Sequence, residues 1–132
     1  MKIKELIKKI VYLIIDGDWF LYRPQYKVSN YKVEINKTDG DIWPSYPHIH
    51  MIDDDIKLDI YTGKMYRIQT RKEIGQSSDK DMEKIWNDRK NLEIIMFQRE
   101  NKPINVGKLE EIPYKWINVE NIEWLKRNYN IK

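Results

Sequence analysis

The sequence predicts an α+β domain in which helices pack on one face of an antiparallel sheet. Segments with a period of two follow one another along the middle of the chain and are separated by short turns, as in antiparallel sheets. Segments with helical spacing lie before and after them, which favours helices that are segregated from the strands. The length of 132 residues fits one domain, spanning 1–132.

The first element expected is an N-terminal helix over residues 2–15. Its apolar side chains recur at helical spacing, whereas the lysines fall mostly on the other side. The segment Asp16-Gly17-Asp18 ends the helix, with Gly17 placed for a left-handed cap.

The middle of the chain predicts about four or five strands. A short aromatic strand over 19–22 stops at Pro24, and Thr38-Asp39-Gly40 is a turn. Thr62-Gly63 closes a tight hairpin, for which Gly63 supplies a positive φ. The remaining strands are expected at 31–35, 48–52, 57–61 and 65–70.

After the sheet, one long helix and a short C-terminal helix are expected. Ser78 is the predicted N-cap of a helix over 79–89, and the helical spacing of apolar residues continues to about Arg99. The alternative ends this helix at Arg89 and places a strand at 92–98. Asn118 is the predicted cap of the last helix.

Composition excludes several classes of protein. The chain has no cysteine, which removes disulfides, iron–sulfur clusters and thiol nucleophiles and favours a cytoplasmic location. With 24 basic and 21 acidic residues the net charge is +3, less than dedicated duplex-DNA binders usually carry. The apolar run 10–15 is too short for a membrane span and has no signal-peptide cleavage site, so we expect no membrane partner.

The two histidines of the chain stand in the segment Pro47-His48-Ile49-His50. In a strand, residues i and i+2 point to the same face, so the imidazoles of His48 and His50 lie side by side while Ile49 points to the core. Such a pair can act as general acid and base, ligate a metal ion, or belong to a solvated sheet face.

The first functional hypothesis is a small metal-independent ribonuclease that needs no cofactor and cleaves RNA by histidine acid–base catalysis. His, Lys, Arg and Tyr are the residue types that move protons and stabilise the charged phosphorane. The helix followed by a histidine-bearing sheet resembles, in architecture, the ribonuclease toxins of bacterial toxin–antitoxin pairs. The predicted catalytic residues are His48, His50, Tyr66 and Arg67, and the predicted substrate-binding residues are Lys57, Tyr61, Lys64 and Trp43.

Two alternatives stay open. One is a non-enzymatic interaction protein, such as a phage inhibitor or an antitoxin-like partner, whose contact surface is the loop with Trp43, Pro44 and Pro47. The other is a small metal-dependent enzyme on His48 and His50, because two histidines with one carboxylate form an open metal site. The carboxylates considered for the third ligand are Asp53, Asp54, Asp55 and Asp59.

Overall fold

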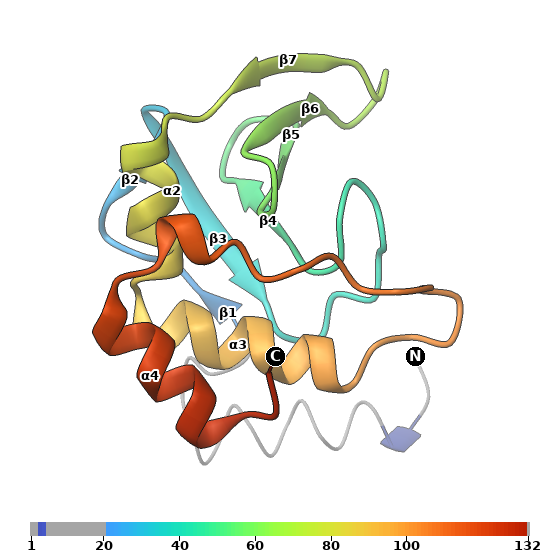
Figure 1. Cartoon of the computed structure of the whole chain (residues 1–132). Helices are drawn as coiled ribbons and strands as arrows, with labels where there is room; N and C mark the ends of the chain where they lie inside the picture. The colour runs from blue at the N-terminus through green and yellow to red at the C-terminus, as the bar shows by residue number, and fades with distance from the viewer. Residues whose placement is uncertain (1–2, 5–20, 132) are drawn as a thin grey trace.

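A seven-stranded antiparallel sheet forms the centre of the structure, a computed structural model that describes residues 3–4 and 21–131 (Figure 1). The strand order is β1-β3-β4-β5-β6-β7, and β2 also pairs with β3. The strands are β1 (Leu21–Tyr22), β2 (Lys27–Val28), β3 (Tyr31–Asn36), β4 (His48–Met51), β5 (Ile56–Asp59), β6 (Lys64–Arg67) and β7 (Glu73–Gln76).

The sheet confirms the α+β class but has more strands than the four or five predicted. The additional strands leave little trace in the sequence: β2 has two residues, too few for a period, and β7 has mostly exposed residues, so it shows no alternation of burial. The predicted hairpin around Thr62-Gly63 is present, and Gly63 has a φ of +80°. Of the helix predicted over 2–15, the structure describes residues 3–4, which are helical; the rest of it and the first half of the strand at 19–22 lie outside the described residues.

The long helix predicted after the sheet is wrong, because the structure has two helices there. They are α2 (Asp79–Trp86) and α3 (Arg89–Glu100), so the segment 92–98 is helical and not a strand. The helix is interrupted at Asp88. The side chain of Asp88 accepts hydrogen bonds from the backbone N–H groups of Lys90 and Asn91 and thereby caps the second helix.

The caps predicted for the other helices are confirmed. Ser78 accepts from the backbone N–H of Asp81 at the start of α2. After a short 3₁₀ helix, η2 (Tyr114–Trp116), Asn118 caps α4 (Val119–Asn128). Among the helices of residues 3–4 and 21–131, none combines the length and the apolar character needed to cross a membrane.

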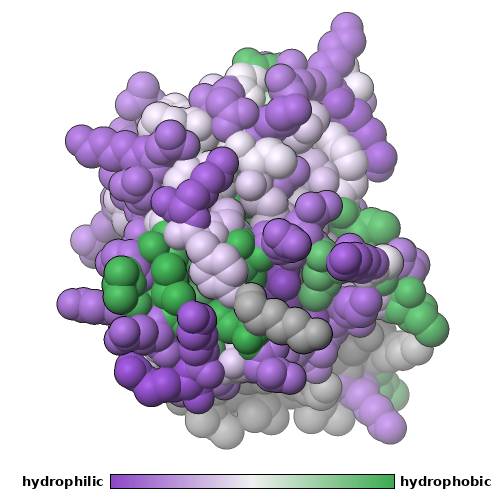
Figure 2. Space-filling view, in the orientation of Figure 1, coloured by the Kyte–Doolittle hydropathy of each residue, from purple (hydrophilic) through white to green (hydrophobic). Residues whose placement is uncertain are grey.

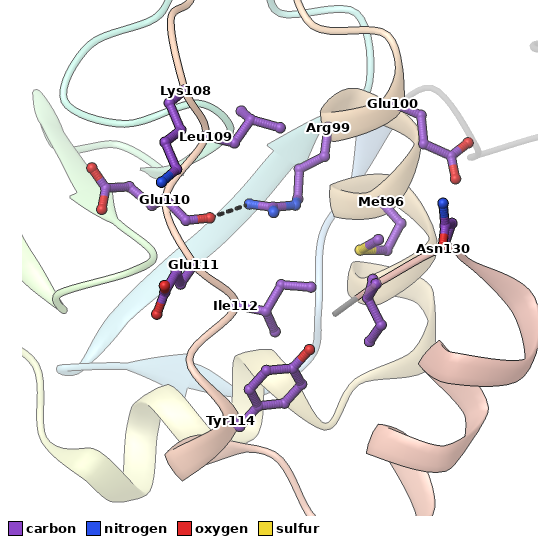
Figure 3. Close-up of a pocket in the computed structure, with 11 residues that line it drawn as sticks. Met96, Arg99, Glu100, Lys108, Leu109, Glu110, Glu111, Ile112, Tyr114 and Asn130 are labelled. Carbon is purple, nitrogen blue, oxygen red and sulfur yellow. Dashed lines mark hydrogen bonds between the residues drawn. The ribbon is translucent and has the colours of Figure 1, made fainter.

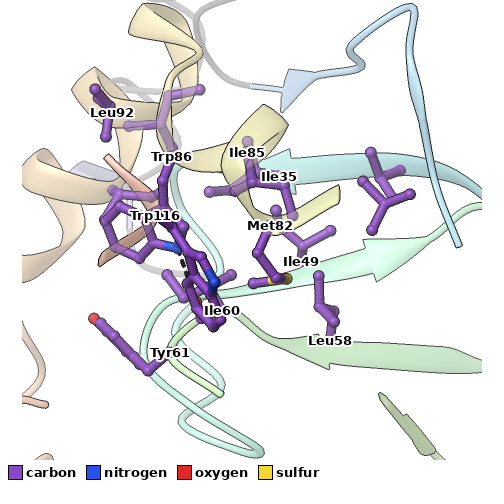
Figure 4. Close-up of a cluster of buried hydrophobic side chains, with 14 of the residues drawn as sticks. Ile35, Ile49, Leu58, Ile60, Tyr61, Met82, Ile85, Trp86, Leu92 and Trp116 are labelled. Carbon is purple, nitrogen blue, oxygen red and sulfur yellow. Dashed lines mark hydrogen bonds between the residues drawn. The ribbon is translucent and has the colours of Figure 1, made fainter. Parts of the chain in front are cut away.

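The core lies between one face of the sheet and the helices (Figure 4). Ile49 and Leu58 are paired in register on this face, and both are fully buried. Trp86 of α2 is also buried, and its indole N–H donates to the carbonyl oxygen of Ile60 at 2.8 Å, which ties the helix to the end of β5. Because side chains alternate along a strand, the residues between these core positions point to the opposite face, where the histidines lie.

Candidate metal site

The two histidines lie on one face of β4, as the sequence predicts. His48 is in register with Asp59 of β5, and His50 is in register with Lys57. Ile49 and Met51 point to the core, with 1% and 2% of their surfaces exposed. The prediction of paired imidazoles on a central strand is therefore confirmed.

The segment between β3 and β4, residues 37–47, folds back over the histidine-bearing face, and we call it the site loop (right side of Figure 1). Asp39 brings its carboxylate between the two histidines. Its Oδ2 lies 3.1 Å from Nε2 of His48 and 2.9 Å from Nε2 of His50, and the two Nε2 atoms lie 3.2 Å apart. Each of the three side chains thus contributes one atom to a close triangle: Nε2 of His48, Nε2 of His50 and Oδ2 of Asp39.

The site loop also fixes the direction of the Asp39 carboxylate. Its other oxygen, Oδ1, accepts the backbone N–H of Asp41 at 3.0 Å, so Oδ2 is the atom turned toward the histidines. From the helical side, the amide nitrogen of Gln98 in α3 donates to the carbonyl oxygen of Asp39 at 3.2 Å. Backbone and helix together therefore hold this short side chain in place.

The contacts of His48 define where its protons lie. Its Nδ1 is 3.0 Å from the carbonyl oxygen of Ser45, which can only accept, so Nδ1 carries a hydrogen. In the neutral imidazole, Nε2 then has a lone pair and no hydrogen. Nε2 lies 3.1 Å from the Asp39 carboxylate, so either Nε2 also carries a proton that it donates to the carboxylate, or a cation lies between the two acceptors.

The site is closed on one side and open on the other. The side chain of His48 is 2% exposed, whereas those of Asp39 and His50 are 22% and 29% exposed. Burial raises the pKa of Asp39, but hydrogen bonds from His48, His50 and the backbone of Asp41 outweigh it and hold the pKa well below its usual range. The carboxylate is therefore ionised at neutral pH.

The three atoms have the spacing of a metal-binding face. Donor atoms about 2.1 Å from an ion and at right angles lie roughly 3.0 Å from one another. The N–N and N–O separations of 2.9–3.2 Å between His48, His50 and Asp39 match that arrangement. A hydrogen bond from Nδ1 to a backbone carbonyl, as His48 makes, is the usual outer contact of a ligating histidine.

The structure corrects the choice of third ligand. The sequence predicts only a turn at Asp39, and the carboxylates that it offers as the third metal ligand all follow the histidines. Asp59 stands opposite His48, but its Oδ1 accepts the backbone N–H groups of Tyr61 and Thr62 in the hairpin turn. The three aspartates 53–55 are exposed in the turn after β4, beyond Met51, and none belongs to the histidine cluster.

The predicted catalytic partners divide between the two faces of the sheet. Tyr66 is in register with Lys57 and so lies on the histidine face, two strands from His50. Arg67 is in register with Ile56, a core residue, so it is on the opposite face. The structure therefore brings Tyr66, but not Arg67, to the side of the imidazoles.

The predicted substrate-binding residues have different surroundings. Lys57 is buried and forms an ion pair with Asp41 of the site loop, and Lys64 pairs with Glu73 at 3.4 Å. Tyr61 is buried under the site loop, where its hydroxyl donates to the carbonyl oxygen of Tyr46.

Burial raises the pKa of Tyr61, and the guanidinium of Arg99 opposes this shift. Trp43 is half-buried, and its ring packs edge to face against Tyr66 of β6. Pro44 is half-buried too, and Pro47 is buried.

A cavity between α3 and the segment 108–112 lies away from the histidines (Figure 3). It encloses about 650 Å³. Arg99 crosses it and donates to the carbonyl oxygen of Glu110 at 2.8 Å. None of its lining residues belongs to the cluster of Asp39, His48 and His50, so the cavity is not the access route to that cluster.

Comparisons with known proteins add no family to this geometry. No protein-family model, no curated protein and no solved structure matches the chain significantly. The functional argument therefore rests on the site itself.

Proposed function

We propose that the chain is a small metal-dependent hydrolase whose mononuclear site is formed by Asp39, His48 and His50. The observation that carries this proposal is the triangle of donor atoms, in which Oδ2 of Asp39 and the Nε2 atoms of His48 and His50 lie 2.9–3.2 Å from one another. One carboxylate and two neutral imidazoles leave a net charge of −1, which a divalent cation neutralises.

Three protein ligands on one side leave positions for water and substrate. Sites that hold zinc or similar ions with three protein ligands are typical of catalysis, whereas structural zinc sites usually have four. The partial exposure of Asp39 and His50 supplies access from solvent. A Zn²⁺ ion held by these three residues would lower the pKa of a bound water toward 7 and so would supply a nucleophile at neutral pH.

The metal-independent ribonuclease predicted from the sequence requires a different placement of the two histidines. An acid and a base that serve one phosphate must contact different oxygens, the attacking and the leaving one. The Nε2 atoms of His48 and His50 lie 3.2 Å apart and contact each other, and His48 is buried. We therefore place metal-assisted hydrolysis before it.

The interaction-protein alternative requires an available loop. The site loop instead directs Asp39, Asp41 and Trp43 onto the sheet, and its exposed large hydrophobic residue is Ile42, with 38% of its surface accessible. This geometry favours a loop whose side chains form part of the site over a loop whose side chains contact a protein partner.

The first test is titration of the purified chain with Co²⁺, whose visible absorption reports nitrogen and oxygen ligation. We expect one equivalent to bind, and the absorption to disappear in His48→Ala and His50→Ala. The matched control is Asp54→Asn, an exposed carboxylate of the turn after β4, which should bind as the wild type does. Binding that survives His48→Ala would overturn the proposed ligand set.

The second test is hydrolysis of bis(4-nitrophenyl) phosphate, an activated phosphodiester. Activity should stop in excess EDTA and return when Zn²⁺, Co²⁺ or Mn²⁺ is restored. Cleavage of RNA that persists in EDTA and leaves 2′,3′-cyclic phosphate ends would instead support the metal-independent ribonuclease.

A further inference from the structure

An aromatic pair lies on the histidine face beside the candidate metal site. The rings of Trp43 and Tyr66 are edge to face, with centroids 5.6 Å apart and an angle of 62° between their planes. Both side chains are half-buried, so each keeps an accessible part. Exposed aromatic rings on a sheet are the surfaces on which unpaired bases stack.

The side chain of Arg71 packs on the Trp43 ring of this pair. The guanidinium of Arg71, in the β6–β7 connection, lies 4.6 Å from the centre of the Trp43 ring. Arg71 is exposed and forms no ion pair within residues 3–4 and 21–131, whereas Arg23 and Lys64 pair with acidic residues. Its donors are therefore available to a phosphate, for which the planar guanidinium is well suited.

The position of the pair relative to the histidines follows from the strand register. Tyr66 pairs with Lys57, and Lys57 pairs with His50, so the three residues form one row across β6, β5 and β4. Two strand spacings separate Tyr66 from His50, or about 10 Å. The site loop covers Lys57 between them, so a nucleic-acid strand that stacks a base on Tyr66 would reach the site by passing over this loop.

The surface around this row is hydrophilic. Figure 2 shows hydrophilic and intermediate residues over most of the upper part of the face in view, where β6 and β7 lie, and hydrophobic patches among hydrophilic side chains lower down. The segment 64–73 carries Lys64, Arg67, Arg71 and Lys72 against one acidic residue, Glu73. Of these basic residues Arg67 lies on the opposite face and Lys64 is paired with Glu73, which leaves Arg71 and Lys72 as the cations available to a charged polymer.

We propose that single-stranded nucleic acid is the substrate class, with a base stacked on Tyr66 beside Trp43 and a phosphate held by Arg71, which packs on the Trp43 ring. This inference rests on the proposed hydrolase, because it names what reaches the same site. Single strands are favoured over duplexes because stacking requires an unpaired base. The net charge of +3 and the single free arginine at the pair also provide little for a duplex backbone.

The test is fluorescence anisotropy with a labelled twelve-nucleotide uridine RNA and the matching thymidine DNA, both in EDTA. Because EDTA removes metal ions, this measurement reports nucleic-acid binding whether or not the metal site exists. The Co²⁺ titration is done without nucleic acid, so the two proposals can fail independently. We expect Tyr66→Leu, which keeps an apolar side chain, to weaken binding at least about fivefold, the range of one lost stacking contact.

Arg71→Gln should weaken binding and reduce the slope of log affinity against log salt by about 0.7, the value for one phosphate contact on a single strand. The matched control is Arg127→Gln, an exposed arginine of α4, which should bind as the wild type does. Far-ultraviolet circular dichroism checks that each variant is folded.

Three results would overturn the proposal. The first is no binding of either oligonucleotide by the wild type, which would leave a protein or small-molecule substrate. The second is equal affinity for a duplex of the same length. The third is an equal loss of affinity in Arg71→Gln and Arg127→Gln, which would reduce the effect to general charge.

Discussion

Two aspartates of the site loop, Asp39 and Asp41, use the same backbone geometry and meet different partners on the sheet. Each directs one carboxylate oxygen to a backbone N–H two residues ahead, that of Asp41 or of Trp43. The other oxygen of Asp41 meets the ammonium group of Lys57, whereas that of Asp39 meets His48 and His50.

The difference lies in what neutralises the charge. Lys57 is a permanent cation, and its side chain is 7% exposed, so the pair with Asp41 is complete within the protein. Burial raises the pKa of Asp41, and the hydrogen bond and charge of Lys57 outweigh it and lower the pKa. Asp39 has no lysine or arginine in its ion pairs, and so its partners leave a place for an added cation.

The comparison is therefore between a closed ion pair that fastens the loop and an open cluster that can bind a metal ion. The two are linked, because the candidate ligand Asp39 lies on the same loop that the Asp41–Lys57 ion pair holds against the sheet. The predictions below separate the two roles, beginning with the largest expected effect.

Asp39→Asn and Asp41→Asn form a matched pair of variants for metal affinity. Asp39→Asn removes the anionic ligand and should weaken Co²⁺ binding by more than about 100-fold, beyond the usual cost of losing an outer contact. Asp41→Asn should weaken it by less than about tenfold, since it acts only through the loop. Isothermal titration calorimetry measures both, and equal losses would show that the two aspartates do not differ in role.

Asp41→Asn should have its main effect on folding stability. It leaves the ammonium group of Lys57 buried without its charge partner, which should lower the free energy of unfolding by about 2 kcal/mol. Urea denaturation in EDTA measures this loss. In a Lys57→Met background the same change should cost clearly less, and an unchanged cost would exclude the ion pair as its cause.

Gln98→Leu tests whether α3 positions the metal ligand. The change removes the hydrogen bond to the Asp39 carbonyl while keeping an apolar volume at a buried position. We expect metal affinity to fall about tenfold, the lower range for an outer contact. Titration with Co²⁺ measures this, and an unchanged affinity would mean that the loop backbone alone orients Asp39.

Ser78→Ala supplies the reference for a loss of stability far from the loop. It removes the cap of α2 and should lower the free energy of unfolding by about 1 kcal/mol. Metal affinity should remain that of the wild type, because Ser78 contacts neither the loop nor the histidines. A parallel fall in affinity would indicate that binding follows global stability rather than the geometry of the loop.

The fold class was predictable where the local pattern is strong, as at the hairpin of Gly63 and the caps Ser78 and Asn118. The failures have physical causes. The apolar spacing of the long helix continues across Asp88, but the backbone of Asp88 is extended, and its side chain accepts from the N–H groups of Lys90 and Asn91 and from the hydroxyls of Tyr22 and Tyr26. The strands β2 and β7 depend on pairing with neighbours, which a short or polar segment does not reveal.

The sequence by itself determined that His48 and His50 share a face, because the period of a strand is a local property of the backbone. Asp39 could not be assigned in the same way. Its carboxylate reaches the histidines because β3 and β4 are neighbours and the loop between them turns back over the sheet, held by Lys57 and Gln98. These are contacts between residues distant in sequence, so only the tertiary structure decided which carboxylate completes the site.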